Sequence, residues 1–253
     1  MATNPFDLTD RIAVVTGANT GLGQGIAVAL ARAGADIVAV GRSMPTETEG
    51  DVAAAGRRLL WVEASLDTIA PVGHIVERAV AEFGGIDILV NNAGTIRRND
   101  SLDFTEEDWD AVMDVNLKSV FFLSQAVARW WTAHGRSGKI INIASMLSFQ
   151  GGIRVPSYTA SKSGVLGITR LLANEWASKG INVNAIAPGY FSTNNTEALR
   201  NDEARNKSIL ERIPAGRWGK PEDIGGAAVF LSSAAADYVH GAVLPVDGGW
   251  LAR

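Results

Sequence analysis

The chain of 253 residues contains no cysteine and only three histidines. Without cysteine it can form neither a disulfide nor a thiolate nucleophile, and this composition agrees with a reducing compartment. The histidines, His74, His134 and His240, have no acidic partners at the spacing of metal ligands, so we expect no metal site. Solvated or capping roles are expected for all three.

The chain also has no large excess of positive or negative charge. The chain has 23 basic and 27 acidic residues, and the basic residues form no tract that would indicate a nucleic-acid partner. No uncharged apolar run reaches the length of a membrane span. The N-terminal segment 1–10 has acidic residues and lacks the apolar core of a signal peptide. We therefore expect a cytoplasmic protein with no membrane or nucleic-acid partner.

The chain instead contains short apolar runs that alternate with longer helical patterns. Strands are predicted at Arg11–Gly17, Asp36–Gly41, Arg58–Ala64, Ile86–Gly94, Lys139–Ser145, Ile181–Pro188 and Ala242–Gly249, and helices at Gly23–Gly34, Ala70–Gly84 and Thr105–His134. This order predicts an α/β fold: a Rossmann-type, doubly wound parallel sheet of about seven strands with helices on both faces. No linker divides the chain, so residues 1–253 are expected to form one domain. The polar segment 190–213 is predicted to cover the substrate, with a plain surface excursion as the alternative.

A glycine-rich loop, Thr16–Gly23, connects the first strand to the first helix. Gly17, Gly21 and Gly23 would allow a tight turn and a close approach of the backbone to a pyrophosphate at the helix N-terminus. The second strand ends at Gly41 and is followed by Arg42 and Ser43, with no carboxylate to bind a ribose hydroxyl. Arg42 and Ser43 could bind a 2′-phosphate, which favours NADP over NAD. If Arg42 is merely solvated, the cofactor is NAD.

Tyr158 and Lys162 lie four residues apart, on one face of a predicted helix. A nearby ammonium favours the phenolate and lowers the pKa of a tyrosine, as an acid/base catalyst requires. Ser145 ends the fifth predicted strand, where active sites of α/β proteins gather. Asn116 lies inside the predicted helix Thr105–His134, where a buried amide needs partners. Together these residues indicate a catalytic group.

With the glycine loop, Asn91–Gly94, and Pro188, Gly189 and Thr193, this set resembles the short-chain dehydrogenase/reductase family over essentially the full chain. The resemblance implies hydride transfer to or from a nicotinamide, with Tyr158 as acid/base, Ser145 on the substrate oxygen, Lys162 tuning Tyr158, and Asn116 linking Lys162 to water. The predicted cofactor-binding residues are Gly17, Asn19, Thr20, Gly21, Leu22, Gly23, Arg42, Ser43, Ser65, Leu66, Asn92, Ala93, Gly94, Tyr158, Lys162, Pro188, Gly189 and Thr193. Gly41 and Ser65 stand where many members carry acidic residues. A homotetramer is also implied.

Several local segments, among them 96–100, 145–165, 189–200 and Pro45–Thr48, resemble family members that act on keto-deoxy sugar acids and lean toward NAD. The predicted substrate-binding residues are Ser145, Gln150, Arg154, Tyr158 and Asn194. Arg154 is expected to bind the substrate carboxylate, with a surface or interface ion pair as the alternative; Arg97 and Arg98 also lie near the predicted site. Two other functions stay open: a 3-oxoacyl carrier-protein reductase and a non-catalytic nucleotide-binding scaffold.

Overall fold

The computed structural model describes residues 4–253 and contains one parallel sheet of seven strands. The strands are β1 (Ile12–Thr16), β2 (Asp36–Gly41), β3 (Leu59–Glu63), β4 (Ile88–Asn91), β5 (Gly138–Ile143), β6 (Ile181–Pro188) and β7 (Val243–Val246). They lie in the order β3-β2-β1-β4-β5-β6-β7, and every pairing is parallel. The predicted doubly wound sheet is confirmed. Of the N-terminal segment considered above, residues 1–3 lie outside the described residues.

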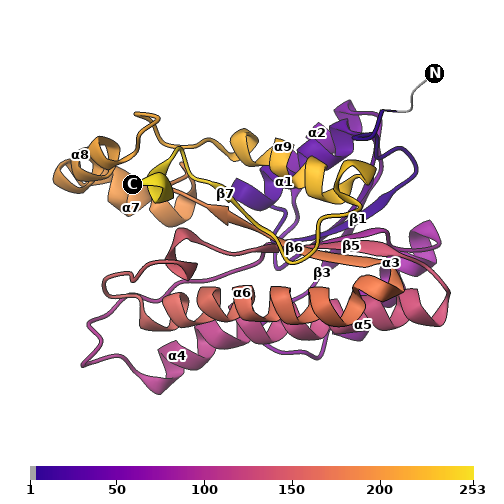
Figure 1. Ribbon diagram of the computed structural model, residues 1–253, viewed down its shortest axis with the longest axis horizontal. Helices are drawn as coiled ribbons and strands as arrows, with labels where there is room; N and C mark the ends of the chain where they lie inside the picture. Colours follow the sequence, from indigo (N-terminus) through magenta and orange to yellow (C-terminus); the bar gives the residue numbers. More distant parts are fainter. Residues whose placement is uncertain (1–3) are drawn as a thin grey trace.

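Helices cover both faces of this sheet (Figure 1). They are α1 (Gly21–Arg32), α2 (Thr46–Ala54), α3 (Val72–Phe83), α4 (Glu106–Met113), α5 (Ser119–Ala133), α6 (Pro156–Trp176), α7 (Glu197–Asn201), α8 (Glu203–Arg212) and α9 (Gly225–Ser232). Helices α1, α2 and α9 lie on one face, and α4, α5 and α6 lie on the other (Figure 1). None of the helices within residues 4–253 combines the length and apolar character needed to cross a bilayer.

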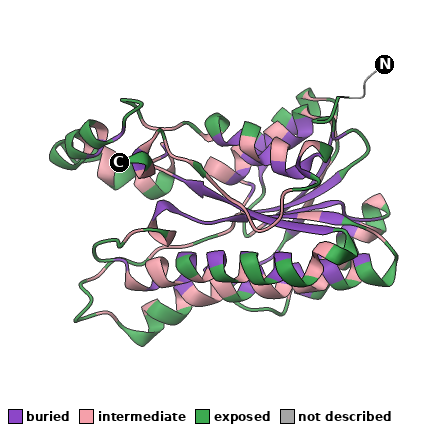
Figure 2. Ribbon diagram, viewed as in Figure 1, coloured by how far each residue is buried: buried purple, intermediate pink, exposed green. Residues whose placement is uncertain are grey.

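The core forms two apolar layers, one on each side of the sheet. In β1, Ala13 and Val15 join the layer under α1 and α9, whereas Ile12 and Val14 join the layer over α3 and α5. This alternation follows from the pleat, which turns successive side chains to opposite faces. The central strands are buried along their length (Figure 2), and their uninterrupted apolar runs reflect a sheet covered on both sides.

Two features of the helices differ from the prediction, and a third segment agrees with it. The helix expected over Thr105–His134 is divided by a π-helical turn at Asp114–Lys118 between α4 and α5. Helix α2 was not predicted, because its sequence TETEGDVAA contains one large apolar residue and shows no apolar periodicity. The segment 190–213, expected to consist of a loop or helices, contains two short helices, α7 and α8, preceded by the 3₁₀ turn Asn194–Thr196.

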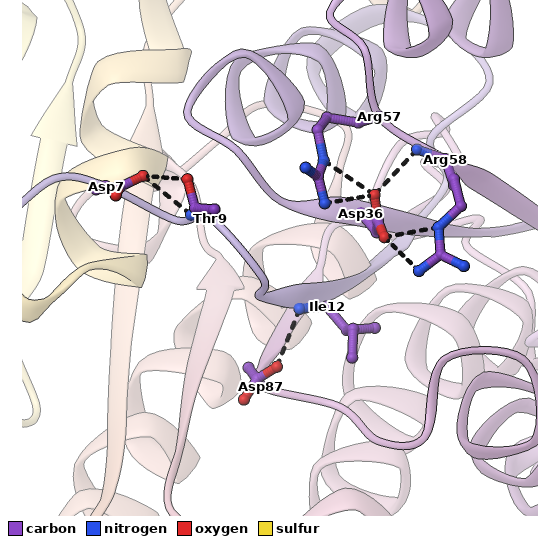
Figure 3. Close-up of polar contacts among 7 residues, drawn as sticks. All are labelled: Asp7, Thr9, Ile12, Asp36, Arg57, Arg58 and Asp87. Carbon is purple, nitrogen blue, oxygen red and sulfur yellow. Dashed lines mark hydrogen bonds and ion pairs between the residues drawn. The ribbon is translucent and has the colours of Figure 1, made fainter.

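At the amino ends of the strands, two buried carboxylates are surrounded by hydrogen-bond donors (Figure 3). Asp36 pairs with Arg57 and Arg58, and the backbone N–H of Arg58 also donates to it at 3.0 Å. Burial alone raises the pKa of Asp36, but the hydrogen bonds from Arg58 and the positive charges of both arginines outweigh burial and hold this pKa below its ordinary value. Asp87 accepts a hydrogen bond from the backbone of Ile12 at 3.0 Å.

Candidate active site

A cavity of about 580 Å³ opens at the carboxyl ends of the strands, where the strand order reverses between β1 and β4. Ligands of doubly wound sheets bind at such a position. The cavity is lined by the glycine loop, by the ends of β2, β4, β5 and β6, and by residues 193–196. Every residue predicted to bind the cofactor lines it, and so do Ser145 and Asn194. One cavity thus joins the predicted nucleotide and catalytic residues.

The glycine loop has the geometry of a phosphate cradle. Gly17 and Gly21 adopt φ values of +65° and +59°, a region that favours glycine. A Cβ on Gly23 would collide with the carbonyl oxygen of Gly17 and with the Asn92 side chain. The Asn92 amide donates to the Thr16 carbonyl at 2.9 Å and fixes the loop against the end of β4. The free N–H groups at the start of α1 therefore face the cavity, as pyrophosphate binding requires.

The second strand ends at the part of the cavity that would receive the adenosine ribose. Gly41, Arg42 and Ser43 all line the cavity. The Asn19 amide of the glycine loop donates to the Ser43 hydroxyl at 2.9 Å. With no carboxylate on Gly41 and an exposed guanidinium on Arg42, this region can accept the negative charge of a 2′-phosphate.

Asn116 lies in the π-helical turn and is fully buried. Its Oδ1 accepts a hydrogen bond from the Thr95 N–H at 2.8 Å, and its Nδ2 donates to the Thr95 carbonyl at 2.9 Å and to the Ser161 hydroxyl at 3.3 Å. The turn therefore aims the amide at the loop after β4 and at α6. Asn116 stands behind the cavity wall, and π-helical turns of this kind recur at functional sites.

Tyr158 and Lys162 are brought together by the first turns of α6, which begins at Pro156. The Lys162 Nζ lies 5.8 Å from the centroid of the Tyr158 ring and donates to the Ile143 carbonyl at 2.6 Å. Ser145 lies two residues beyond the end of β5 and lines the same cavity as Tyr158. The three side chains thus meet at the end of β5, beside the nucleotide cradle.

Burial dominates the protonation of this group. It raises the pKa of Tyr158 above its ordinary value of 10.0, while the hydrogen bond from Ser145 and the charge of Arg98 act in the opposite direction. Burial lowers the pKa of Lys162 to about 8. Near neutral pH, Tyr158 is therefore a phenol with a proton to donate, and Lys162 is mainly an ammonium. That Lys162 lowers the pKa of Tyr158 remains a prediction.

The predicted substrate-binding residues divide into two groups. Asn194 lines the cavity with Ser145 and Tyr158, whereas Gln150 and Arg154 are not among its lining residues. The Gln150 Oε1 accepts a hydrogen bond from Arg212 at 3.4 Å. The Arg154 Nε forms an ion pair with Asp100 at 3.2 Å. The structure therefore does not bring these two side chains into the cavity that Ser145 and Tyr158 line.

Two other arginines, Arg97 and Arg98, are associated with the cavity or with Tyr158. Arg97 lines the cavity, and its Nε pairs with Asp108 at 3.2 Å. Arg98 influences Tyr158 electrostatically and donates to the Asn195 carbonyl at 3.2 Å. Arg98 thus connects the loop after β4 to the start of the segment 190–213. Arg98 thus places positive charge near Tyr158, and Arg97 adds positive charge to the cavity lining.

The segment 190–213 packs on the C-terminus of the chain, and Figure 1 shows α7 and α8 beside that end. Ile209 and Ile213 are buried against Trp250, and the Arg212 guanidinium stacks over the Trp250 ring at 4.0 Å. The Trp218 Nε1 donates to Asn206 of α8 at 2.8 Å. The segment is therefore anchored away from the cavity while its first residues line it.

A short-chain dehydrogenase family model, described as Enoyl-(Acyl carrier protein) reductase, matches residues 17–251. The chain belongs to the short-chain dehydrogenase/reductase family. It is therefore an NAD(P)-dependent oxidoreductase, and its cofactor is NAD or NADP, as the sequence predicts. The description of the family model does not by itself choose a substrate, because one fold serves many chemistries.

Individual members of this short-chain dehydrogenase/reductase family match along the whole chain. The 2-dehydro-3-deoxy-D-gluconate 5-dehydrogenase of Escherichia coli (strain K12) is 64% identical over 253 residues, which cover 100% of both chains. A structure from Agrobacterium tumefaciens with bound NADP, provisionally named a 2-deoxy-D-gluconate 3-dehydrogenase, is 65% identical, with a TM-score of 0.94 and coverage of 99% and 100%. A gluconate 5-dehydrogenase from Burkholderia cenocepacia J2315, in complex with NADP and tartrate, is 40% identical, with a TM-score of 0.92 and 98% coverage of both chains.

The sequence patterns of this short-chain dehydrogenase/reductase left some cavity residues unassigned. Asp67, Thr95 and Thr196 line the cavity although no motif singled them out as ligand contacts. Asp67 follows Ser65 and Leu66 at the end of β3, so the parallel register of the strands could have indicated it. None of the histidines belongs to a metal-binding cluster, because the described residues contain no group of three or more potential metal ligands.

Proposed function

We propose that this enzyme interconverts a ketone and a secondary alcohol on a keto-deoxy sugar acid, in the manner of a 2-dehydro-3-deoxy-D-gluconate 5-dehydrogenase. The observation that carries the proposal is the convergence of Ser145, Tyr158 and Lys162 with a phosphate cradle in one cavity. The full-length relative with 64% identity supports the choice of substrate. A 2-deoxy-D-gluconate 3-dehydrogenase activity would use the same residues.

In the direction of reduction, the Tyr158 phenol donates its proton to the ketone oxygen, and in oxidation the phenolate takes that proton back. Ser145 donates a hydrogen bond to the same oxygen and stabilises the negative charge that develops there. The Lys162 ammonium stabilises the phenolate that remains after proton transfer. Asn116 holds the loop after β4 against α6. When bound, the nicotinamide supplies or accepts the hydride.

The glycine loop, Asn92 and Gly94 would hold the nucleotide, and Pro188, Gly189 and Thr193 would lie beside the nicotinamide. We propose a preference for NADP, because Arg42 and Ser43 line the cavity after β2 and Gly41 offers no carboxylate to the ribose. Bound NADP in two similar structures supports this preference.

Arg97 is our candidate for the substrate carboxylate, because it lines the cavity and keeps its terminal guanidinium nitrogens beyond the Nε pair with Asp108. Arg154, the residue expected from the sequence, stays a weaker candidate, since its Nε pairs with Asp100 and its side chain does not line the cavity. Asn194 and Asn195 offer partners for sugar hydroxyls.

The polar lining argues against the 3-oxoacyl carrier-protein reductase, which needs an apolar path for its acyl chain. Arg97 and the run from Thr193 to Thr196 line the cavity with a charged side chain and polar side chains. The scaffold alternative conflicts with the membership of an oxidoreductase family and with a complete set of catalytic side chains. We also propose that residues 1–253 form one domain with residues 190–213 covering the substrate, and that the protein assembles as a homotetramer.

The test is an assay of the purified protein with 2-dehydro-3-deoxy-D-gluconate, related keto-deoxy sugar acids and a 3-oxoacyl thioester, each with NADH and NADPH. We expect turnover of a sugar acid with a preference for NADPH. Faster turnover of the thioester would establish the rival activity. In the same assay, Arg97→Met should raise the KM for the acid about tenfold or more, as the loss of a charge-assisted hydrogen bond predicts. Arg154→Met is the matched comparison, and a larger effect there would return the carboxylate to Arg154.

A further inference from the structure

The segment Pro45–Thr48 has no role in the chemistry described so far, yet it opens helix α2 beside the glycine loop. Thr48 is fully buried, with an exposed fraction of 0%. Its Oγ1 donates a hydrogen bond of 2.7 Å to the carbonyl oxygen of Ala18, which lies between Gly17 and Asn19 in the glycine loop. Helix α2 is thus bonded directly to the loop that would hold the pyrophosphate.

A second hydrogen bond joins the same two segments. The Asn19 amide donates to the Ser43 hydroxyl at 2.9 Å, so two consecutive loop residues are linked to the turn after β2 and to the first turn of α2. The turn after β2 carries Arg42 and Ser43, which line the cavity and are the residues proposed above to bind a 2′-phosphate. Through these two hydrogen bonds, a shift of the glycine loop would also shift the turn that carries Arg42 and Ser43.

The choice of threonine at position 48 is informative. Thr48 and Val52 are the buried residues of α2, and they lie four residues apart on one face. A valine at position 48 would serve apolar packing as well as it does at position 52. The hydroxyl of threonine is needed because the Ala18 carbonyl lies in a residue that is only 1% exposed, and a buried acceptor requires a donor.

We propose that Thr48 is a positioning residue for the cofactor: through Ala18 it holds the glycine loop and the Arg42–Ser43 turn in the arrangement that binds a 2′-phosphate. Thr48 does not line the cavity, so it acts without touching the nucleotide. The inference rests on the cofactor site and the NADP preference proposed above. Thr48 would then influence the preference for NADP although it is not one of the residues that contact the cofactor.

The test compares Thr48→Val, which removes the hydroxyl and keeps the shape, with Thr48→Ser, which keeps the hydroxyl. Thr46→Val is the matched control, because Thr46 is exposed on the same helix. Calorimetry would measure the Kd of NADPH, NADH, 2′,5′-ADP and 5′-AMP for each protein, alongside its Tm. These probes do not depend on knowing the sugar acid.

For Thr48→Val we expect the Kd of NADPH and of 2′,5′-ADP to rise about tenfold, the affinity equivalent of one hydrogen bond to a buried group. The Kd of NADH and of 5′-AMP should rise much less, and kcat at saturating NADPH should be unchanged. Thr48→Ser and Thr46→Val should stay within about twofold of the wild type, which is under 0.5 kcal/mol. A purely structural role would lower the Tm and weaken all four ligands equally.

Equal weakening of NADPH and NADH, or no weakening in Thr48→Val, would overturn the inference while leaving the proposed function intact. If the wild type bound 2′,5′-ADP no more tightly than 5′-AMP, the NADP preference itself would fail, and this inference with it. Should Thr48→Val not fold, Thr48→Ala removes the same hydroxyl without placing a branched apolar side chain against the loop, and the same comparison of ligands applies.

Discussion

The two ends of the parallel sheet treat buried charge in opposite ways. At the amino ends, Asp36 is matched by Arg57 and Arg58 (Figure 3), and Asp87 accepts hydrogen bonds from the Ile12 backbone and from the Arg11 and Arg136 side chains. At the carboxyl ends, the Lys162 ammonium is held by the Ile143 carbonyl alone among its described hydrogen-bond partners, and burial lowers its pKa to about 8. At the amino ends the buried carboxylates have paired donors, whereas at the carboxyl ends the buried Lys162 ammonium has no carboxylate partner among its described hydrogen bonds.

This difference separates residues that stabilise the fold from residues that perform the chemistry. A matched carboxylate fixes the starts of strands and changes its protonation only in acid. A buried ammonium without a counterion is costly to the fold, and such a cost is retained where proton transfer needs it. Substitutions at the two ends should therefore affect different measurements.

The largest expected effect is on catalysis by Tyr158→Phe. Removing the phenol removes the acid/base, so kcat should fall by about a thousandfold, within the range for general acid–base catalysis. The Kd for NADPH, measured by fluorescence titration, should stay near the wild-type value because the cradle is intact. Tyr238→Phe serves as the control, since Tyr238 is fully exposed. Retained turnover in Tyr158→Phe would remove this residue from the mechanism.

Lys162→Met should uncouple activity from stability. We expect turnover to fall by about a hundredfold or more, because the phenolate loses its stabilising charge. The Tm at pH 7 should not fall, since an apolar side chain avoids the cost of burying an ammonium. Lys179→Met, at an exposed position, should change neither quantity.

The pH dependence of folding stability provides a second test of the buried Lys162 ammonium. The pKa of Lys162 is about 8 in the folded protein, below its ordinary value of 10.5. Between these two pH values the unfolded chain holds a proton that the folded protein has released, so wild-type stability should rise with pH relative to Lys162→Met. Parallel urea titrations at pH 7, 8 and 9.5 measure the difference. A constant difference would show that the ammonium is not destabilised by burial.

At the opposite end, Asp36→Asn should lower stability without changing kcat. Loss of the carboxylate leaves Arg57 and Arg58 without their partner and should reduce the free energy of unfolding by about 2 kcal/mol, less than for a fully buried pair because Arg58 is largely exposed. Urea denaturation at pH 7 measures the loss. Asp51→Asn is the control at an exposed position of α2.

Acid titration tests the same residue. Because the pKa of Asp36 is lower in the folded protein than in the unfolded chain, its contribution is present above about pH 4 and disappears as the pH falls through the lowered folded value. The wild type should therefore lose more stability in acid than Asp36→Asn does. Equal acid dependence in the two proteins would contradict the pairing.

Much of the site could be predicted from the sequence, for reasons that differ between residues. Gly17, Gly21 and Gly23 were identifiable because a strand, a glycine turn and a helix follow one another directly in the chain. Tyr158 and Lys162 were identifiable because their spacing of four matches one helical turn. By contrast, Arg154 was chosen for its nearness in sequence to Tyr158, and nearness in sequence does not set the direction of a loop side chain. The structure turns Arg154 toward Asp100.

The sequence by itself determined the parallel α/β order, the phosphate cradle and the catalytic spacing, because each depends on local periodicity or on a turn between neighbouring elements. Only the tertiary structure decided that Arg97 rather than Arg154 lines the cavity, that Asn116 lies in a π-helical turn, and that Thr48 bonds to Ala18. The cavity lining and the Thr48–Ala18 bond bring together segments that meet only after the strands have aligned in register. The pattern of residues within any one segment therefore cannot encode them.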